Sequence, residues 1–189
     1  QLANAFVFYF SGVFHLAAPA FEQAGNTFLE QTTGHYFEIS SCRLFSLFSW
    51  GHQGKMRIFD ERFEEYLRDA KRRGDRYFET TLVRYGSRGY LAHGRPEFAK
   101  TEINRSIWTT SEGAFHLQHW YELEARCNVA LYEGKSRNVL KDKAATFHEM
   151  EHSLLLRIQI VRSIVFWIQA RLLVAAALGD KENASVYLH

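Results

Sequence analysis

Glycines at regular intervals constrain the fold of this chain more than any other feature of its sequence. They form two interleaved series whose steps are 39 or 40 residues, with one last step of 45. The first series is Gly34, Gly74 and Gly113, and the second is Gly54, Gly94, Gly134 and Gly179. Glycine just after an amphipathic run is typical of a helix C-terminus, because it reaches the left-handed conformation without a Cβ penalty. We therefore interpret each interval of about 20 residues as one helix.

The composition agrees with this interpretation and indicates the fold class. Only two prolines, Pro19 and Pro96, interrupt a chain of 189 residues in which helix-forming residues are frequent. Two successive helices make a hairpin of about 40 residues, and hairpins repeated at a fixed period stack into a solenoid. We predict an all-α fold, an α-α superhelix of four to five hairpins in a single domain over residues 1–189.

The segments between the glycines differ in polarity, which separates inner from outer helices. Those that follow Gly34, Gly74 and Gly113 are dense in aromatic and apolar residues, as we expect of inner helices. The segment between Gly54 and Gly74 instead has one apolar stripe at spacings of three and four, with charged residues elsewhere. The stripe consists of Met56, Phe59, Phe63, Tyr66, Leu67 and Ala70. It predicts a surface helix that packs on a neighbour.

The two ends of the chain complete the set of predicted hairpins. Residues 3–14 and 21–32 predict a first hairpin that turns at residues 17–19. Residues 153–178 predict the most apolar helix, which we expect to be buried, because its three arginines disfavour a membrane span. The sequence begins with Gln1 and stops in what would be the next helix, so we expect a fragment of a longer protein. A truncated solenoid exposes an apolar end, which makes self-association possible.

Net charge and cysteine usage restrict the partners and the compartment. A net charge of +2 gives no overall electrostatic reason to expect a nucleic acid partner. Cys42 and Cys127 each lie in an apolar segment and belong to no metal-ligand pattern. We interpret both as buried thiols and expect a cytoplasmic protein, because free thiols are typical of reducing compartments.

The segment HEMEH at residues 148–152 fits the H-E-x-x-H pattern of zinc metalloproteases. In that pattern two histidines on one helical face bind zinc, and the glutamate activates metal-bound water. A third ligand is required, but Leu155 and Ile158 stand where the extended pattern needs glycine and histidine, and Glu182 lies on no convincing ligand helix. We therefore reject a metal site at His148, Glu149 and His152 and interpret the segment as a solvated helix end.

No other pattern indicates catalysis. His116 and His119 form a second histidine pair, but no Cys or acidic residue is patterned near them, so we expect packing or hydrogen bonding at a helix N-terminus. Dinucleotide-binding, phosphate-binding, hydrolase and kinase catalytic motifs do not occur. We expect no enzymatic activity and no cofactor in this chain.

Two segments carry a resemblance to a known family. Residues 113–134 read GAFHLQHWYELEARCNVALYEG, and SLLLRIQIVRSIVFWIQARLLVAAAL begins at Ser153. Together they resemble the tetratricopeptide-like helical repeat region found C-terminal to the kinase domain of large bacterial serine/threonine protein kinases. EISSCRLFSLFSWGHQGKM and EEYLRDAKRRGDRYFETTLVRYG are similar to consecutive hairpins of that region, so the resemblance covers most of the chain.

The resemblance implies a noncatalytic segment attached to a cytoplasmic kinase, used for protein interaction or for sensing that regulates the kinase. Its distinctive pieces are FHLQH at residues 115–119 and LLLR at residues 154–157. The chain departs from the family just before the second piece, where residues 147–152 replace a segment that is usually aromatic at its start and then basic. No catalytic residue transfers, because the kinase motifs lie outside this chain.

We predict a protein-interaction or regulatory scaffold whose inner helices line a concave surface for a peptide or a partner helix. Six polar residues interrupt the apolar inner helices and are our candidate partner contacts: Arg43, Arg84, Arg88, His119, Glu122 and Arg126. Ion pairs within the stack are the alternative role for each of them. We expect joint replacement of Arg84 and Arg88 by Ala to weaken partner binding without unfolding the chain.

Two other functions stay open at this point. The first is a small-molecule sensor domain of a signalling protein, since the four tryptophans permit an apolar pocket. An enclosed cavity would favour the sensor, and an open groove would favour the scaffold. The second is a zinc hydrolase that uses residues 148–152, which the missing third ligand disfavours. We expect no membrane partner.

Overall fold

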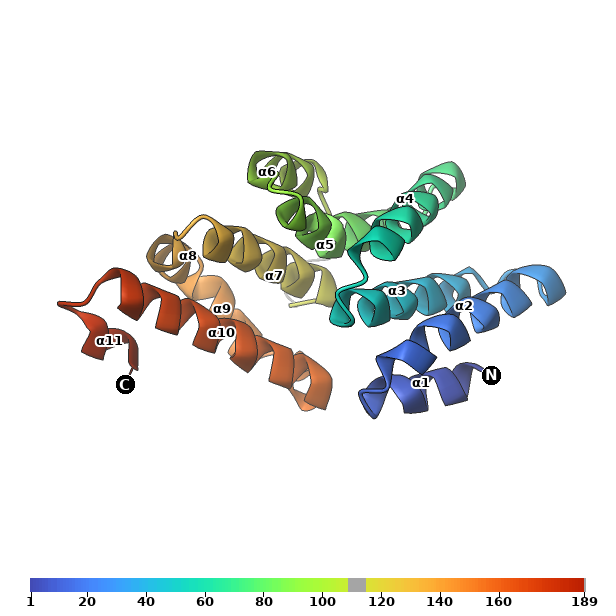
Figure 1. Cartoon of the computed structure of the whole chain (residues 1–189), viewed down its shortest axis with the longest axis horizontal. Coiled ribbons are helices and arrows are strands. Elements are labelled where there is room, and N and C mark those ends of the chain that lie inside the picture. The colour runs from blue at the N-terminus through green and yellow to red at the C-terminus, as the bar shows by residue number, and fades with distance from the viewer. Residues whose placement is uncertain (109–114, 189) are drawn as a thin grey trace. The chain divides into compact units, whose positions relative to one another are not determined.

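The computed structural model describes residues 1–108 and 115–188. The secondary structure of these residues is helical. Eleven α-helices and one short 3-10 helix follow one another, with no β-strand in the described residues (Figure 1). The all-α prediction is confirmed. The chain divides into two compact units, Gln1–Leu82 and Val83–His189, with the boundary inside α5 (Arg76–Ala92). The single-domain assignment of residues 1–189 stays a prediction.

The first unit consists of four helices and the beginning of α5. The four are α1 (Leu2–Phe10), α2 (Phe14–Gln31), α3 (Tyr36–His52) and α4 (Met56–Arg73). From α1 to α4, each helix packs against its neighbour in the sequence, and α1 also contacts α3. Figure 1 shows α2 and α3 running side by side as a helical hairpin.

Aromatic rings fill the space where α1, α2 and α3 meet. Phe6 lies edge-on to Phe21 and to Phe45, with ring centroids 5.0 and 4.9 Å apart. Tyr9 meets Phe45 in the same edge-on geometry at 5.0 Å, and Phe21 is fully buried. Edge-to-face pairs contribute about 1 kcal/mol each beyond the burial of their area, so this cluster fixes how the three helices cross.

Helix α4 confirms the surface helix that the apolar stripe predicts. Phe59, Phe63, Tyr66 and Ala70 are buried, and most of the other faces carry charged side chains. The helix ends at Gly74, which follows three basic residues in the last turn. Basic side chains at this end interact favourably with the negative end of the helix dipole.

The first hairpin turns at a different place from the one predicted. The turn lies at Ser11–Val13 around Gly12, which has a φ of 74°. Pro19 stands inside α2, on an exposed face, instead of in the turn. Proline removes one helical hydrogen bond, and on an exposed face water can replace it, whereas only glycine reaches a φ near 74° without strain. The conformation of Gly12 therefore decides the turn.

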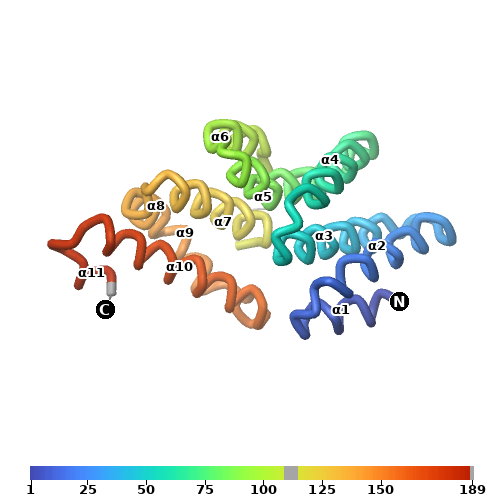
Figure 2. Tube along the Cα trace, viewed as in Figure 1, coloured from blue at the N-terminus to red at the C-terminus, as the bar shows by residue number. Residues whose placement is uncertain are grey.

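The second unit contains the remainder of α5 and the helices that follow it. They are α6 (Pro96–Arg105), α7 (Leu117–Tyr132), α8 (Ser136–Asp142), α9 (Ala144–Glu151), α10 (Gln159–Gly179) and α11 (Ala184–Leu188), with a 3-10 turn at Leu154–Arg157. Helix α10 contacts α7, α8 and α11. Figure 2 follows the chain through α8 and α9, which connect α7 to α10.

One apolar core joins α7 to α10 through α8 and α9. Its buried members include Trp120, Leu123, Cys127, Val139, Phe147, Met150, Val165, Ile168 and Leu172. A smaller core, with Leu91, Ile103 and Val129, holds α5, α6 and α7 together. Cys127 and, in the first unit, Cys42 are buried free thiols, as predicted.

The C-terminal part differs from the prediction in two respects. Residues 148–152, which we interpret from the sequence as a solvated helix end, belong to the end of a separate helix, α9, whose Phe147 and Met150 pack in the core. Helix α10 begins at Gln159, not at Ser153, and its burial is one-sided: Phe166 and Trp167 are more than half exposed. By length and composition α10 is the one described helix that could span a membrane, which is weak evidence because a core helix of a soluble protein passes the same test.

The same joint recurs where several helices end. At Gly74, the glycine N–H donates to the carbonyl of Lys71 at 3.2 Å, and the N–H of Asp75 donates to the carbonyl of Ala70 at 3.0 Å. This pair of bonds is the Schellman motif, which needs a left-handed residue. It also occurs at Gly12, Gly54, Gly94 and Gly134. The next helix begins two residues later in each case. Gly113 lies outside the described residues.

Candidate functional site

The six candidate residues lie on α3, α5 and α7, the helices that the sequence marks as inner ones. Arg43 belongs to α3, Arg84 and Arg88 to α5, and the other three to α7. The structure brings five of them together within the second unit, whereas Arg43 lies in the first. Each of the six makes polar contacts within the chain, which the following paragraphs describe.

Arg84 is a buried connector between α5 and α7. Its side chain is only 3% exposed, and Nη1 donates to the carbonyl and the side-chain oxygen of Gln118 at 2.7 and 2.8 Å. Nη2 donates to the carbonyl of Ser106 at 2.9 Å and to Glu122 at 3.0 Å. Burial lowers the pKa of Arg84, and Glu122 opposes that shift. The guanidinium thus adds hydrogen bonds to one carbonyl of α7 and to the carbonyl that ends α6, which ties both helices to α5.

Glu122 and Arg126 extend this polar group toward the surface. Arg126 Nε donates to Glu122 at 2.9 Å, and Arg126 Nη1 donates to the side-chain oxygen of Asn104 at 3.0 Å. Both charged side chains are about one-third exposed, at 31% for Arg126 and 33% for Glu122. This partly exposed pair is therefore the part of the group that a partner could reach.

Arg88 makes a second tie between α5 and α7. Its Nη2 lies 3.0 Å from a carboxylate oxygen of Glu124, whose side chain is 9% exposed. The guanidinium also stacks on the ring of Tyr85, 3.8 Å from the ring centroid. A guanidinium on an aromatic face and beside a buried carboxylate is held in one orientation.

Arg43 makes the corresponding tie between α3 and α4 in the first unit. It pairs with Asp69 and lies over the ring of Tyr66 at 5.1 Å. Asp69 also accepts from Arg72 at 2.6 Å and from Arg73 at 2.9 Å. Burial alone would raise the pKa of Asp69, but hydrogen bonds from Arg43 and Arg72 and the charges of Arg43 and Arg73 outweigh it and lower the pKa to about 2.

His119 caps the start of α7. The backbone N–H of His116 donates to His119 Nδ1 at 3.0 Å, which satisfies an N–H that the helix itself leaves unpaired. Because Nδ1 accepts this bond, it carries no proton. Burial, and then the nearby His116 and Arg84, lower the pKa of His119. The hydrogen bonding that the sequence suggests for this histidine pair is thus present.

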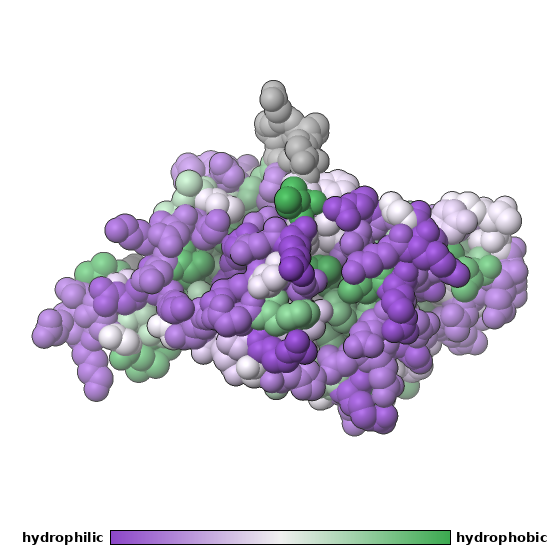
Figure 3. Space-filling model, turned by 90° about the horizontal axis from the view of Figure 1, so that it is seen from above, coloured by the Kyte–Doolittle hydropathy of each residue, from purple (hydrophilic) through white to green (hydrophobic). Residues whose placement is uncertain are grey.

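These contacts change what the six residues can be expected to do. Arg84 is so deeply engaged that its removal must affect stability, so the joint alanine replacement of Arg84 and Arg88 is no clean test of partner binding. The role of the six residues as partner contacts stays a prediction, which the partly exposed Arg126 and Glu122 fit best. Hydrophilic residues predominate on the face of the molecule drawn in Figure 3.

The rejected metal candidate lies at the end of α9. His148, Glu149 and His152 are exposed, and His152 is the residue just after the helix. His152 Nδ1 forms a hydrogen bond with the carbonyl of His148 at 2.8 Å. Among the described residues, no group of three or more His, Cys, Asp and Glu side chains gathers to hold a metal ion. Residues 1–108 and 115–188 thus supply no third ligand for the two histidines.

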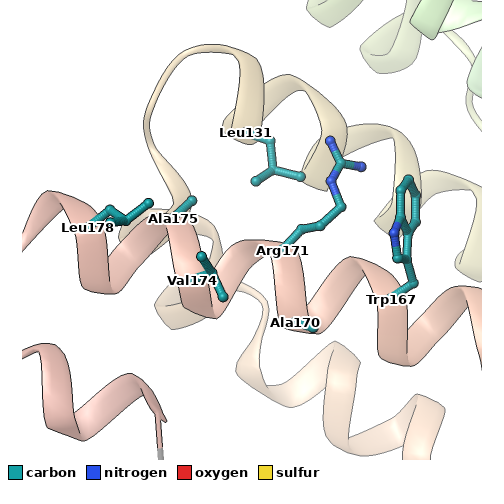
Figure 4. Close-up of a pocket in the computed structure, with 7 residues that line it drawn as sticks. All are labelled: Leu131, Trp167, Ala170, Arg171, Val174, Ala175 and Leu178. Carbon is teal, nitrogen blue, oxygen red and sulfur yellow. The ribbon is translucent and has the colours of Figure 1, made fainter.

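Sequence reasoning missed an apolar surface on α10. Two adjoining hollows open there, with volumes of about 350 and 330 Å³, and both are lined by Val174 and Leu178. Leu131, Trp167 and Arg171 also line the larger hollow, together with two alanines of α10, and Lys181 borders the smaller one. Figure 4 shows Trp167 and Arg171 projecting from α10 to the side where Leu131 of α7 lies. The two hollows are called the α10 groove below.

Arg171 is the polar group within the α10 groove. Its guanidinium stacks over the Trp167 ring at 4.3 Å, and its Nη1 donates to Asn128 at 3.3 Å. Burial, and then the charge of Arg88, lower the pKa of Arg171, while Glu124 opposes them. Tryptophan and arginine on one apolar helix face are a sequence signal for a binding surface. The prediction that the whole helix is buried led us to miss this signal.

Comparisons with known proteins add no family assignment. The chain matches no protein-family model, and no curated protein or solved structure is significantly similar to it.

Proposed function

We propose that this chain is a noncatalytic helical-repeat scaffold that binds a protein or peptide partner. The observation that carries the proposal is the recurring joint: the same two backbone hydrogen bonds close helices at Gly54, Gly74, Gly94 and Gly134. The first three of these glycines are 20 residues apart, and the last is 40 residues further along. A helix–joint unit repeated at a constant period is the construction principle of solenoid proteins.

The hairpin contacts support a stacked, superhelical arrangement. Sequence neighbours pack on one another from α1 to α4 and from α6 to α9, and two helices also contact one beyond the next: α1 contacts α3, and α10 contacts α8. In a solenoid, each helix packs against its partner in the same hairpin and against a helix of the next hairpin. Stacking of the hairpins is what buries the apolar faces of these helices. Solenoids of this kind present extended surfaces, which is why they serve so often as binding scaffolds.

The shape of the apolar surface favours the scaffold over the small-molecule sensor. The two hollows on α10 are open to solvent, and Trp167 at their edge is 56% exposed. Small ligands are usually enclosed over most of their surface, whereas peptides and helices bind in open grooves. The resemblance of residues 113–134 and 153–178 to a kinase-associated repeat region supports a further part of the proposal, a cytoplasmic domain that regulates an attached bacterial serine/threonine kinase.

Photo-cross-linking in cells tests the proposal. A photoreactive phenylalanine analogue replaces, one at a time, four aromatic residues that are all at least 41% exposed: Tyr36, Tyr77, Tyr132 and Phe166. We expect the same protein to be cross-linked from at least one position, and the purified partner to bind the purified chain in calorimetry. The proposal would be contradicted if no protein were cross-linked more strongly to the chain with the analogue than to the chain without it. It would also be contradicted if the purified candidate partner failed to bind.

A further inference from the structure

The α10 groove combines exposed apolar surface with unpaired positive charge. Val174 is 49% exposed and Leu178 is 71% exposed, and both line the two hollows. The hollows therefore form one continuous apolar strip along α10. From Trp167 to Leu178 the helix rises by about 17 Å, the length of about three helical turns. An apolar strip of this length fits one face of a short helix.

The charge of the groove is of one sign. Arg171 lines the larger hollow and Lys181 lines the smaller one. No acidic residue among the described residues lines either hollow. Helix α10 itself contains no Asp or Glu. Glu124, whose charge acts on Arg171, is paired with Arg88 at 3.0 Å, and Asp180, which precedes Lys181 in the sequence, is paired with Arg137 at 3.1 Å. The positive charge of the groove is thus left without a carboxylate partner in the described part of the chain.

Arg171 is the group that most requires such a partner. Its neighbours Trp167 and Asn128 hold the guanidinium in place, but neither is charged. A guanidinium has five N–H donors, and one of them is used by Asn128. A carboxylate delivered to this half-buried, preoriented cation would form a charge-assisted hydrogen bond. Arginine beside tryptophan is also the composition in which binding energy concentrates at protein interfaces.

We propose that the α10 groove binds an amphipathic helix of a partner protein, whose apolar residues fill the two hollows and whose carboxylate pairs with Arg171. This inference rests on the proposed scaffold function and assigns it a site and a partner chemistry. Charge complementarity selects the occupant: an acidic, apolar helix neutralises Arg171, whereas a second α10 would bring two positive strips together. A helix of about four turns, with apolar residues at i, i+4, i+7 and i+11, matches the strip.

Defined peptides test the inference with the full chain. The probe is a fluorescent helical peptide of about 16 residues with leucine at those four positions and a glutamate beside them, and its matched control has glutamine instead. We expect the glutamate peptide to bind at least about tenfold more tightly than the glutamine peptide. Arg171→Gln should abolish this difference, because it removes the cation while leaving the apolar strip in place.

Two further variants separate the groove from the rest of α10. Val174→Asp places a charge between the hollows and should weaken binding of the glutamate peptide at least about tenfold. Phe166→Ser changes a residue that is 55% exposed on the same helix but lines neither hollow, so binding should change less than about twofold. Circular dichroism verifies that each variant keeps its helices. Equal effects of the two variants, or equal binding of both peptides, would overturn the inference.

Other occupants of the groove give distinct results. Binding of the chain to phosphatidylglycerol vesicles that Val174→Asp abolishes would assign the strip to a membrane surface. Dimerisation in analytical ultracentrifugation that the same variant abolishes would assign it to a second copy. Either result overturns the inference. If the partner found by photo-cross-linking binds the Val174→Asp variant as tightly as the original chain, the inference fails while the scaffold function stands.

Discussion

Arg84 Nη2 and Glu122 Oε2 lie 3.0 Å apart, although 38 positions separate the two residues in the sequence. Their contact joins α5 to α7, and the same guanidinium binds the carbonyl of Ser106 at the end of α6. One side chain therefore connects three helices of the second unit. Its position among the apolar residues of α5 suggests a binding residue in the sequence, but its contacts are those of a structural residue.

Replacing Arg84 should destabilise the chain strongly. Arg84→Met removes the hydrogen bonds of the buried guanidinium to Gln118, Ser106 and Glu122, and we expect the free energy of unfolding to fall by about 2 to 3 kcal/mol. Urea unfolding followed by circular dichroism measures the change. The control is Arg57→Met on α4, whose 84% exposed side chain pairs with Glu61 and should contribute less than about 1 kcal/mol. Equal losses in both variants would show that Arg84 is not a structural connector.

Glycine should be required at the helix joints but not at the end of α10. Gly74 has a φ of +68°, and Gly74→Ala should cost about 1 kcal/mol or more because a Cβ disfavours this conformation. Gly179 ends a helix without a positive φ, and an added Cβ there meets nothing within 4 Å. We expect Gly179→Ala to be neutral or slightly stabilising. Thermal unfolding of the two variants compares them, and a Gly74→Ala protein as stable as the original would contradict the assignment.

The stability of the first unit should depend on Asp69 at low pH. Its pKa falls from 3.8 to about 2 on folding, because the hydrogen bonds and charges of its arginine neighbours outweigh burial. A lowered pKa stabilises the folded state above the unfolded value, so this contribution is complete above about pH 5 and is lost as pH falls from about 4 to 2. Allowing for solvent screening, we expect the Asp69 carboxylate to contribute about 1 to 2 kcal/mol to the free energy of unfolding.

The variant Asp69→Asn should lose that contribution at pH 7 and show a flatter stability profile between pH 4 and pH 2. Urea unfolding at a series of pH values measures it. The control, Glu64→Gln, changes a carboxylate that is 70% exposed and lies 3.8 Å from Arg68, so the profile should stay close to that of the original chain. Parallel profiles for all three proteins would disprove the role of Asp69.

Protonation of His119 should loosen the start of α7. The pKa of His119 is lowered by burial, by His116 and by Arg84, so the folded state favours the neutral ring. Its contribution is therefore present at pH 7 and is lost as pH falls below the ordinary histidine value of 6.5. Thermal midpoints between pH 7 and pH 5 should fall less in His119→Gln than in the original chain. His148→Gln, at an exposed position on α9, serves as the matched control.

The sequence predicts the local features of the fold with few errors. Glycine spacing identifies the helix ends at Gly54, Gly74, Gly94 and Gly134, since the left-handed conformation there is a property of the backbone that residue type controls. The apolar stripe of α4 likewise predicts which of its residues are buried. The turn at Gly12 is missed because Pro19 looks like the stronger break, although an exposed helix face tolerates it.

The candidate site is less predictable, because the roles of charged residues depend on distant neighbours. The sequence places Arg43, Arg84 and Arg88 on inner helices, but their carboxylate partners are 26 to 38 positions away. Whether an arginine faces a carboxylate or solvent depends on how helices cross. A pattern of residue types along one helix carries no information about that crossing.

Helix α10 separates the contributions of sequence and tertiary structure most clearly. Its sequence determines that it is helical and apolar around much of its circumference. Only packing decides which face is covered: α7, α8 and α9 bury Val165, Ile168 and Leu172, and they leave Trp167, Val174 and Leu178 accessible. The physical reason is that the hydrophobic effect is not directional, so an apolar helix can bury any of its faces, and the neighbours that the fold supplies select one.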